Sequence, residues 1–194
     1  MRKPHAPTRS LNFMAERLAT MRITGTGRFL PDYSYSTEDV AKMLGAGEEA
    51  LEHYGIEERR WAGELDPEAM AVDPGPLGPD PHRTMAVRAA ERALADGGID
   101  GDDVDRVDTL ILCSCTQPIE GARFATAATG VQHDLGLSKD THTIEVTGGS
   151  ASSMYALQSV ERCLRSGDRN VLLVAINAAA HHLHPIYREL PAAY

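Results

Sequence analysis

One hydroxyl group lies where a predicted strand, a glycine pair and a predicted helix follow one another over residues 142–157. It belongs to Ser150, which follows Gly148 and Gly149. Glycines accept the tight backbone that a strand-to-helix turn requires. The first turn of a helix presents N–H groups and the positive end of the helix dipole, which favour a developing negative charge. This pattern suits acyl transfer, with Ser150 as nucleophile and the backbone of the glycine turn contributing to an oxyanion hole.

A serine hydroxyl is a weak nucleophile unless a hydrogen-bonded base takes its proton. The sequence contains one histidine cluster, His181, His182 and His184, which follows a predicted strand. Its spacing matches no metal-binding pattern, and Pro185 predicts a loop. We therefore interpret these histidines as ordinary exposed side chains rather than as a base or as metal ligands, and we expect no metal site.

The three cysteines, Cys113, Cys115 and Cys163, form no C-x-x-C pair. Two of them fall in an apolar strand and the third on the helix that follows Ser150. We expect all three to be buried, reduced side chains without a disulfide or metal role.

The elements that must position Ser150 alternate between strands and helices. The apolar runs 109–113 and 171–176 are typical of strands whose two faces are both covered by helices. The helix after Ser150 carries an apolar stripe at helical spacing, formed by Met154, Leu157, Val160 and Leu164. The pattern predicts an α/β layered domain, with strands at 22–25, 109–114, 141–146 and 170–175 and helices at 36–44, 48–54, 84–97, 124–135 and 151–165.

Length and composition fit one compact unit. The chain has 194 residues, 42% of them hydrophobic, which is enough for a single core. We expect residues 1–20 to form a flexible N-terminal extension, residues 21–194 to form the domain, and the proline-rich stretch 73–81 to form a surface loop. The net charge of -9 argues against a nucleic-acid partner. The absence of a signal peptide and of an 18-residue apolar run predicts a cytoplasmic protein without a membrane partner.

The order of these motifs resembles the β-ketoacyl-acyl-carrier-protein synthase III branch of the thiolase-like superfamily over residues 21–185. Residues 21–31 are similar to its opening strand and turn, residues 54–60 to its Gly-Ile-x-x-Arg segment, and residues 142–157 to the elements around its nucleophile. The resemblance implies a thiolase-like layered fold with a mixed five-stranded sheet covered by helices, as one half of the usual duplicated fold.

The same resemblance places Ser150 at the position of the family's nucleophilic cysteine. The family's catalytic histidine and asparagine lie in its second half. We therefore expect a subunit of a ketosynthase III-like acyltransferase that works through an acyl-Ser150 intermediate, with histidine and asparagine supplied by a second half or a partner chain. The implied substrates are acyl-CoA or an acylated acyl carrier protein, with no permanently bound cofactor.

Two further expectations concern binding surfaces. Phe124 aligns with a residue that lines the acyl tunnel across the family's dimer interface, although an ordinary core aromatic explains it equally well. Arg59 and Arg60 form the best local basic site for an acidic carrier protein, although a solvated loop edge explains them equally well.

A non-catalytic role is the alternative to an enzyme subunit. In that interpretation the chain is a thiolase-like partner that scaffolds an active ketosynthase or shapes its tunnel, and a truncated or decayed relative is a third interpretation. A homo- or hetero-oligomer is expected in either of the first two cases, because a half-molecule exposes a strand edge and an apolar face that need cover.

Overall fold

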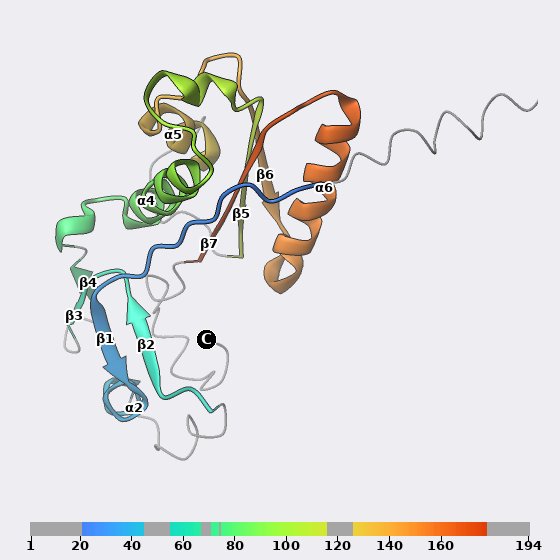
Figure 1. The fold of residues 1–194 in the computed structure, drawn as a ribbon. Helices are drawn as coiled ribbons and strands as arrows, with labels where there is room; N and C mark the ends of the chain where they lie inside the picture. The colour runs from blue at the N-terminus through green and yellow to red at the C-terminus, as the bar shows by residue number, and fades with distance from the viewer. Residues whose placement is uncertain (1–20, 45–54, 67–70, 74, 116–125, 178–194) are drawn as a thin grey trace, which may run out of the picture.

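A three-stranded parallel sheet forms the centre of the protein in a computed structural model (Figure 1). The structure describes residues 21–44, 55–66, 71–73, 75–115 and 126–177. The sheet has the order β6-β5-β7. These strands are β5 (Thr109–Ser114), β6 (His142–Thr147) and β7 (Val171–Ile176). Thr109 is in register with His142 on one side and with Val171 on the other.

Helices cover both faces of this sheet, as its apolar strands predict. Helices α4 (Pro81–Asp96) and α5 (Ala127–Asp134) lie on one face, and α6 (Ser152–Ser166) lies on the other (Figure 1). The α/β layered domain predicted from the alternating pattern is thereby confirmed.

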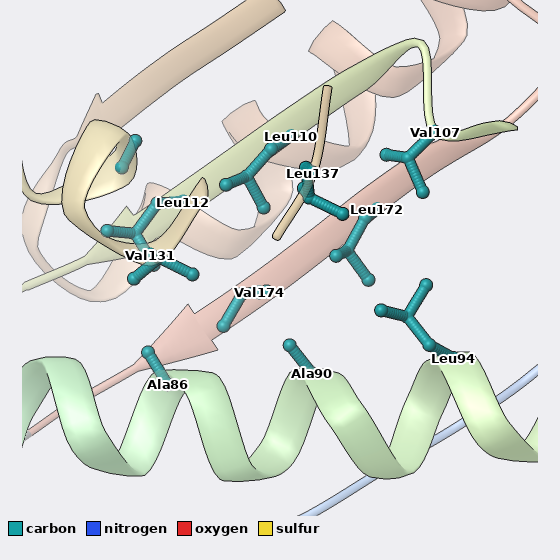
Figure 2. Packing of buried hydrophobic residues seen from close by; sticks show 11 residues of the cluster. Ala86, Ala90, Leu94, Val107, Leu110, Leu112, Val131, Leu137, Leu172 and Val174 are labelled. Carbon is teal, nitrogen blue, oxygen red and sulfur yellow. The ribbon is translucent and has the colours of Figure 1, made fainter. Parts of the chain in front are cut away.

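Side chains of β5 alternate between two cores because successive strand residues point to opposite faces. Leu110 and Leu112 join the core beneath α4 and α5, and Ile111 joins the core beneath α6. In the first core, Ala86 and Ala90 of α4 face the sheet (Figure 2). Their small side chains let the helix approach the sheet closely.

Asp108 joins the starting ends of all three strands. Its carboxylate accepts hydrogen bonds from the N–H groups of Arg169 and Asn170, at 2.7 and 2.9 Å. Its own N–H donates to the carbonyl of Asn170, and its carbonyl accepts from the N–H of His142. One residue thus aligns β6 and β7 on the central strand.

Short elements lie beside this core, and the sequence pattern predicted no strand among them. β1 (Tyr33–Ser36) pairs antiparallel with β2 (Glu58–Trp61), and β3 (Glu64–Asp66) pairs antiparallel with β4 (Ala71–Asp73). The remaining elements are helix α2 (Thr37–Leu44) and the 3-10 turns η1 (Gly75–Leu77), η2 (Gly101–Arg106) and η3 (Gly149–Ala151).

The structure corrects the strand expected over residues 22–25. This segment has no regular secondary structure. It lies instead on α4, where a Cβ atom built at Gly25 would come within 2.3 Å of the carbonyl oxygen of Ala93. A cavity of about 380 Å³ is lined by the segment together with α4, α6 and β7. The central sheet therefore has three parallel strands in the described ranges, where the resemblance implied five mixed ones.

Other boundaries differ by a few residues. The helix expected to begin at Thr84 begins at Pro81, because Pro is well suited to the first helical position and Asp80 caps it by accepting the N–H of Arg83. The proline-rich loop is correspondingly shorter. The extension over residues 1–20 and the helix expected at 48–54 lie outside the described residues.

Burial is uneven along α6 and among the cysteines. Met154 is 64% exposed and Leu157 is 38% exposed, so the apolar stripe of α6 is only partly covered. Ala156 packs on the sheet together with two members of the stripe, Val160 and Leu164. All three cysteines were expected to be buried: Cys113 is buried, Cys163 is partly buried, and Cys115 is exposed. In the ranges the structure describes, no helix is both long enough and apolar enough to cross a membrane.

Candidate functional site

Ser150 lies in the turn η3 that connects β6 with α6, and its side chain is exposed. The glycines before it are needed there for two different reasons. Gly149 has a φ of 55°, in the left-handed region that other residues rarely adopt. The ring of Tyr155 packs on Gly148, where an added Cβ would lie 2.9 Å from a ring carbon. The predicted strand-glycine-helix turn is confirmed, with the hydroxyl facing solvent.

The start of α6 is open to an anion. Neither Gly148, before the 3-10 turn, nor Ala151, before the helix, contributes a side-chain cap. The first backbone N–H groups of a helix need partners, and the 15 residues of α6 place the positive end of a helix dipole at this point. This end of α6 can therefore stabilise negative charge on an oxygen bound beside Ser150.

A base for Ser150 is not found in the part of the chain that the structure describes. No described side chain hydrogen-bonds to its hydroxyl. Glu145 of β6 is engaged elsewhere, since it accepts the N–H of Ala128 at 2.7 Å. His142 lies at the opposite end of β6, and His133 contacts Asp134. The cluster His181, His182 and His184 lies outside the described residues.

A different serine does contact a histidine at this edge of the sheet. His82 Nε2 lies 3.2 Å from Ser114 Oγ. Ser114 is the last residue of β5 and is in register with Thr147, just before the Gly148 turn. The sequence pattern does not indicate this pair, because 32 positions separate its members. No local spacing could have indicated it, since only the packing of α4 on the sheet brings them together.

The cysteines near the turn differ in environment. Burial raises the pKa of the Cys113 thiol, and its contact with Ser153 only partly offsets this effect. Burial also raises the pKa of Cys163, and nearby Asp168 raises it further. Both thiols are therefore protonated and weakly reactive at neutral pH. No group of three or more metal-ligating side chains occurs in the described ranges.

The basic residues predicted to dock a carrier protein lie on β2. The guanidinium of Arg60 bonds to Glu58 at 3.0 and 3.2 Å. Arg59 is half-buried, donates to Thr37 Oγ1 at 3.1 Å, and has a pKa lowered by burial. Docking at Arg59 and Arg60 stays a prediction, and the pairing of Arg60 with Glu58 leaves this site less positive than the sequence suggests. Phe124, predicted to line an acyl tunnel, lies outside the described residues.

Comparisons with known proteins point to one group. A β-ketoacyl-[acyl-carrier-protein] synthase III of Cereibacter sphaeroides is 33% identical over 153 residues, which are 78% of this chain and 41% of that protein. The synthase of the same description in Yersinia pseudotuberculosis is 32% identical over 166 residues, which are 84% of this chain and 46% of that protein. No protein-family model matches the chain.

Solved structures agree. The 3-oxoacyl-(acyl carrier protein) synthase III of Pseudomonas aeruginosa superposes with a TM-score of 0.65 at 25% identity, and the match covers 86% of this chain and 46% of that chain. The chain thus spans less than half the length of each of these relatives.

Proposed function

We propose that this chain is one part of an enzyme that processes acyl thioesters. The proposal starts from its thiolase-like fold, which is that of β-ketoacyl-[acyl-carrier-protein] synthase III over part of that protein's length. One observation carries the proposal: an exposed serine at the uncapped start of a long helix, in a turn where Gly149 adopts a left-handed backbone conformation. Ser150 accepts the acyl group in this proposal. The donor is acyl-CoA or an acylated acyl carrier protein, and no cofactor is permanently bound.

The proposed step follows from the geometry of the turn. Ser150 Oγ attacks the thioester carbonyl while a base takes its proton, and the N–H groups at the start of α6 stabilise the negative charge that forms on the carbonyl oxygen. The C–S bond then breaks, and the leaving thiolate takes up the proton. The product is an acyl ester on Ser150, which a second substrate can accept.

No described side chain bonds to the Ser150 hydroxyl, so the described residues do not supply the base. We propose that a second thiolase-like half or a partner chain supplies a histidine for this purpose and an asparagine beside it. This part would also cover the exposed apolar side of α6, where Met154 and Tyr155 are 64% and 52% exposed. Exposed apolar surface of this kind is typical of an interface.

Intact mass spectrometry of this chain, purified in its natural assembly and incubated with acetyl-CoA, tests the role of Ser150. We expect one acetyl adduct, which Ser150→Ala removes and Ser159→Ala retains. Ser159 is a matched control because it lies on α6 and its hydroxyl bonds to the carbonyl of Tyr155. An adduct that survives Ser150→Ala excludes Ser150 as the acyl acceptor.

The lack of a base among the described residues also supports a second candidate function, a non-catalytic partner that scaffolds an active ketosynthase. The identity of the companion chain separates the two. A companion that places histidine and asparagine beside Ser150 supports catalysis, whereas a companion with a complete cysteine site of its own supports the scaffold. Purification of the natural assembly and determination of its chain content is the deciding measurement.

A further inference from the structure

A buried histidine and a serine form a close pair at the carboxyl edge of the sheet. His82 lies in the first turn of α4 and is only 4% exposed. Its Nε2 atom is 3.2 Å from the hydroxyl oxygen of Ser114, which ends β5 and is partly exposed. The imidazole is thus within hydrogen-bond distance of the hydroxyl of a partly exposed serine, the arrangement that activates a serine nucleophile.

The start of α4 holds the imidazole in place. The guanidinium of Arg83, the next residue after His82, binds Asp134 of α5 through two bonds of 2.6 and 3.0 Å. The hydroxyl of Thr84 donates to the carbonyl of Leu77 at 2.8 Å. These contacts tie the turn that carries His82 to α5 and to η1. A base held in this way can take a proton without first being ordered.

The position of Ser114 in the sheet brings this pair near the turn of Ser150. Ser114 is in register with Thr147 of β6 and Ile176 of β7, and Gly148 directly follows Thr147. Ligands of open parallel sheets bind at the carboxyl ends of the strands. A substrate at this edge can therefore approach Ser114 as well as Ser150.

We propose that Ser114 and His82 form a second nucleophile-base pair, which accepts an acyl group from an activated ester or thioester. Ser114 Oγ attacks the acyl carbonyl carbon, and its proton passes to His82 Nε2. This step requires the His82 tautomer that carries its hydrogen on Nδ1. The bond to the leaving group then breaks, the leaving oxygen or sulfur takes the proton from His82, and an ester remains on Ser114.

p-Nitrophenyl acetate is a suitable probe, because it presents an activated acetyl group without needing a carrier-binding surface. The experiment uses the full chain with two background changes. Ser150→Ala removes the serine of the proposed function, and Cys115→Ala removes the exposed thiol next to Ser114. The acetylated positions are mapped by tandem mass spectrometry after digestion.

We expect acetylation at Ser114 to exceed acetylation at Ser159 in the same molecule, since no histidine bonds to Ser159. The label should disappear in Ser114→Ala, and His82→Gln should slow its formation about tenfold or more. If His82→Gln does not fold, the ratio of label at Ser114 to label at Ser159 in the background protein still decides the question.

Equal labelling of Ser114 and Ser159 would overturn the proposal. So would a rate at Ser114 that a folded His82→Gln protein leaves unchanged, because the contact would then only tie α4 to β5. The test does not depend on the proposed function. The protein tested carries Ser150→Ala, so a negative result for Ser114 says nothing against the role proposed for Ser150, and the two proposals can fail separately.

Discussion

At the scale of single residues, the turn before Ser150 depends on the backbone of Gly149 more than on any side chain. A φ of 55° places Gly149 in the left-handed region. This conformation costs a residue with a Cβ atom about 1–2 kcal/mol, and asparagine tolerates it better than alanine does.

We therefore expect Gly149→Ala to lower the free energy of unfolding by about 1–2 kcal/mol and Gly149→Asn to lower it less. Urea denaturation of the three proteins measures the difference. A Cβ atom built at Gly149 has no neighbouring atom within 4 Å, so steric crowding does not contribute to the difference in stability. A Gly149→Ala protein as stable as the parent would show that the turn adopts another conformation in solution.

Sequence alone predicted the turn that carries Ser150 and its two glycines, because a glycine pair between apolar runs is a local signal. It could not identify His82 and Ser114, whose contact exists only once α4 packs on β5. It also could not show that Cys115 is exposed, since the alternation that buries Cys113 ends where β5 ends. Residue types within one segment are predictable in this way, whereas partners from distant segments are not.

At the scale of elements, the hydrogen bonds through which the Asp108 carboxylate helps to align the strands depend on pH. The N–H groups of Asn170 and Arg169 hold the pKa of its carboxyl below the ordinary value of 3.8. The carboxylate form is thus favoured in the folded state. Its stabilising effect is complete above the unfolded-state pKa and is lost as the pH falls through the lower folded-state pKa.

We expect the free energy of unfolding to decrease with falling pH below about 4, and to decrease less steeply in Asp108→Asn. The same substitution should lower the melting temperature at pH 7, because the two N–H groups lose a charged acceptor. Asp105→Asn is the control, an exposed carboxyl on the neighbouring turn η2. Identical pH slopes for Asp108→Asn and the parent would contradict the role of Asp108.

Elements with strong apolar runs could be predicted closely, and paired elements with polar sequences could not. β5 was predicted over residues 109–114 and occupies Thr109–Ser114, because four of its six residues, from Leu110 to Cys113, form an unbroken apolar run. The antiparallel strands β1 and β2 were not predicted. Serine, glutamate and arginine make up most of them, and a long connection separates the two strands in the sequence. The segment 22–25 was predicted to be a strand, yet its last residue, Gly25, packs on α4.

At the scale of the whole molecule, α6 presents apolar side chains to solvent. We expect the purified chain to associate through this side. Met154→Ser should weaken the association about tenfold, because burial of a large apolar side chain contributes roughly 1.5 kcal/mol. Sedimentation equilibrium at several protein concentrations measures the change.

Gln158→Ser is the matched control on the same helix, because it alters an exposed polar residue and should leave the association unchanged. A chain that stays monomeric at every concentration would contradict the expected oligomer. Equal effects of Met154→Ser and Gln158→Ser would place the contact elsewhere on the molecule.

The central position of β5 also limits the order in which the chain can acquire its structure. Both partners of β5 come later in the sequence, and β7 ends only at Ile176. During synthesis β6 can pair with β5 once Thr147 has emerged, but the other edge of β5 stays unpaired until Ile176 has emerged. Slow translation between β6 and β7 would prolong the time for which that edge is exposed.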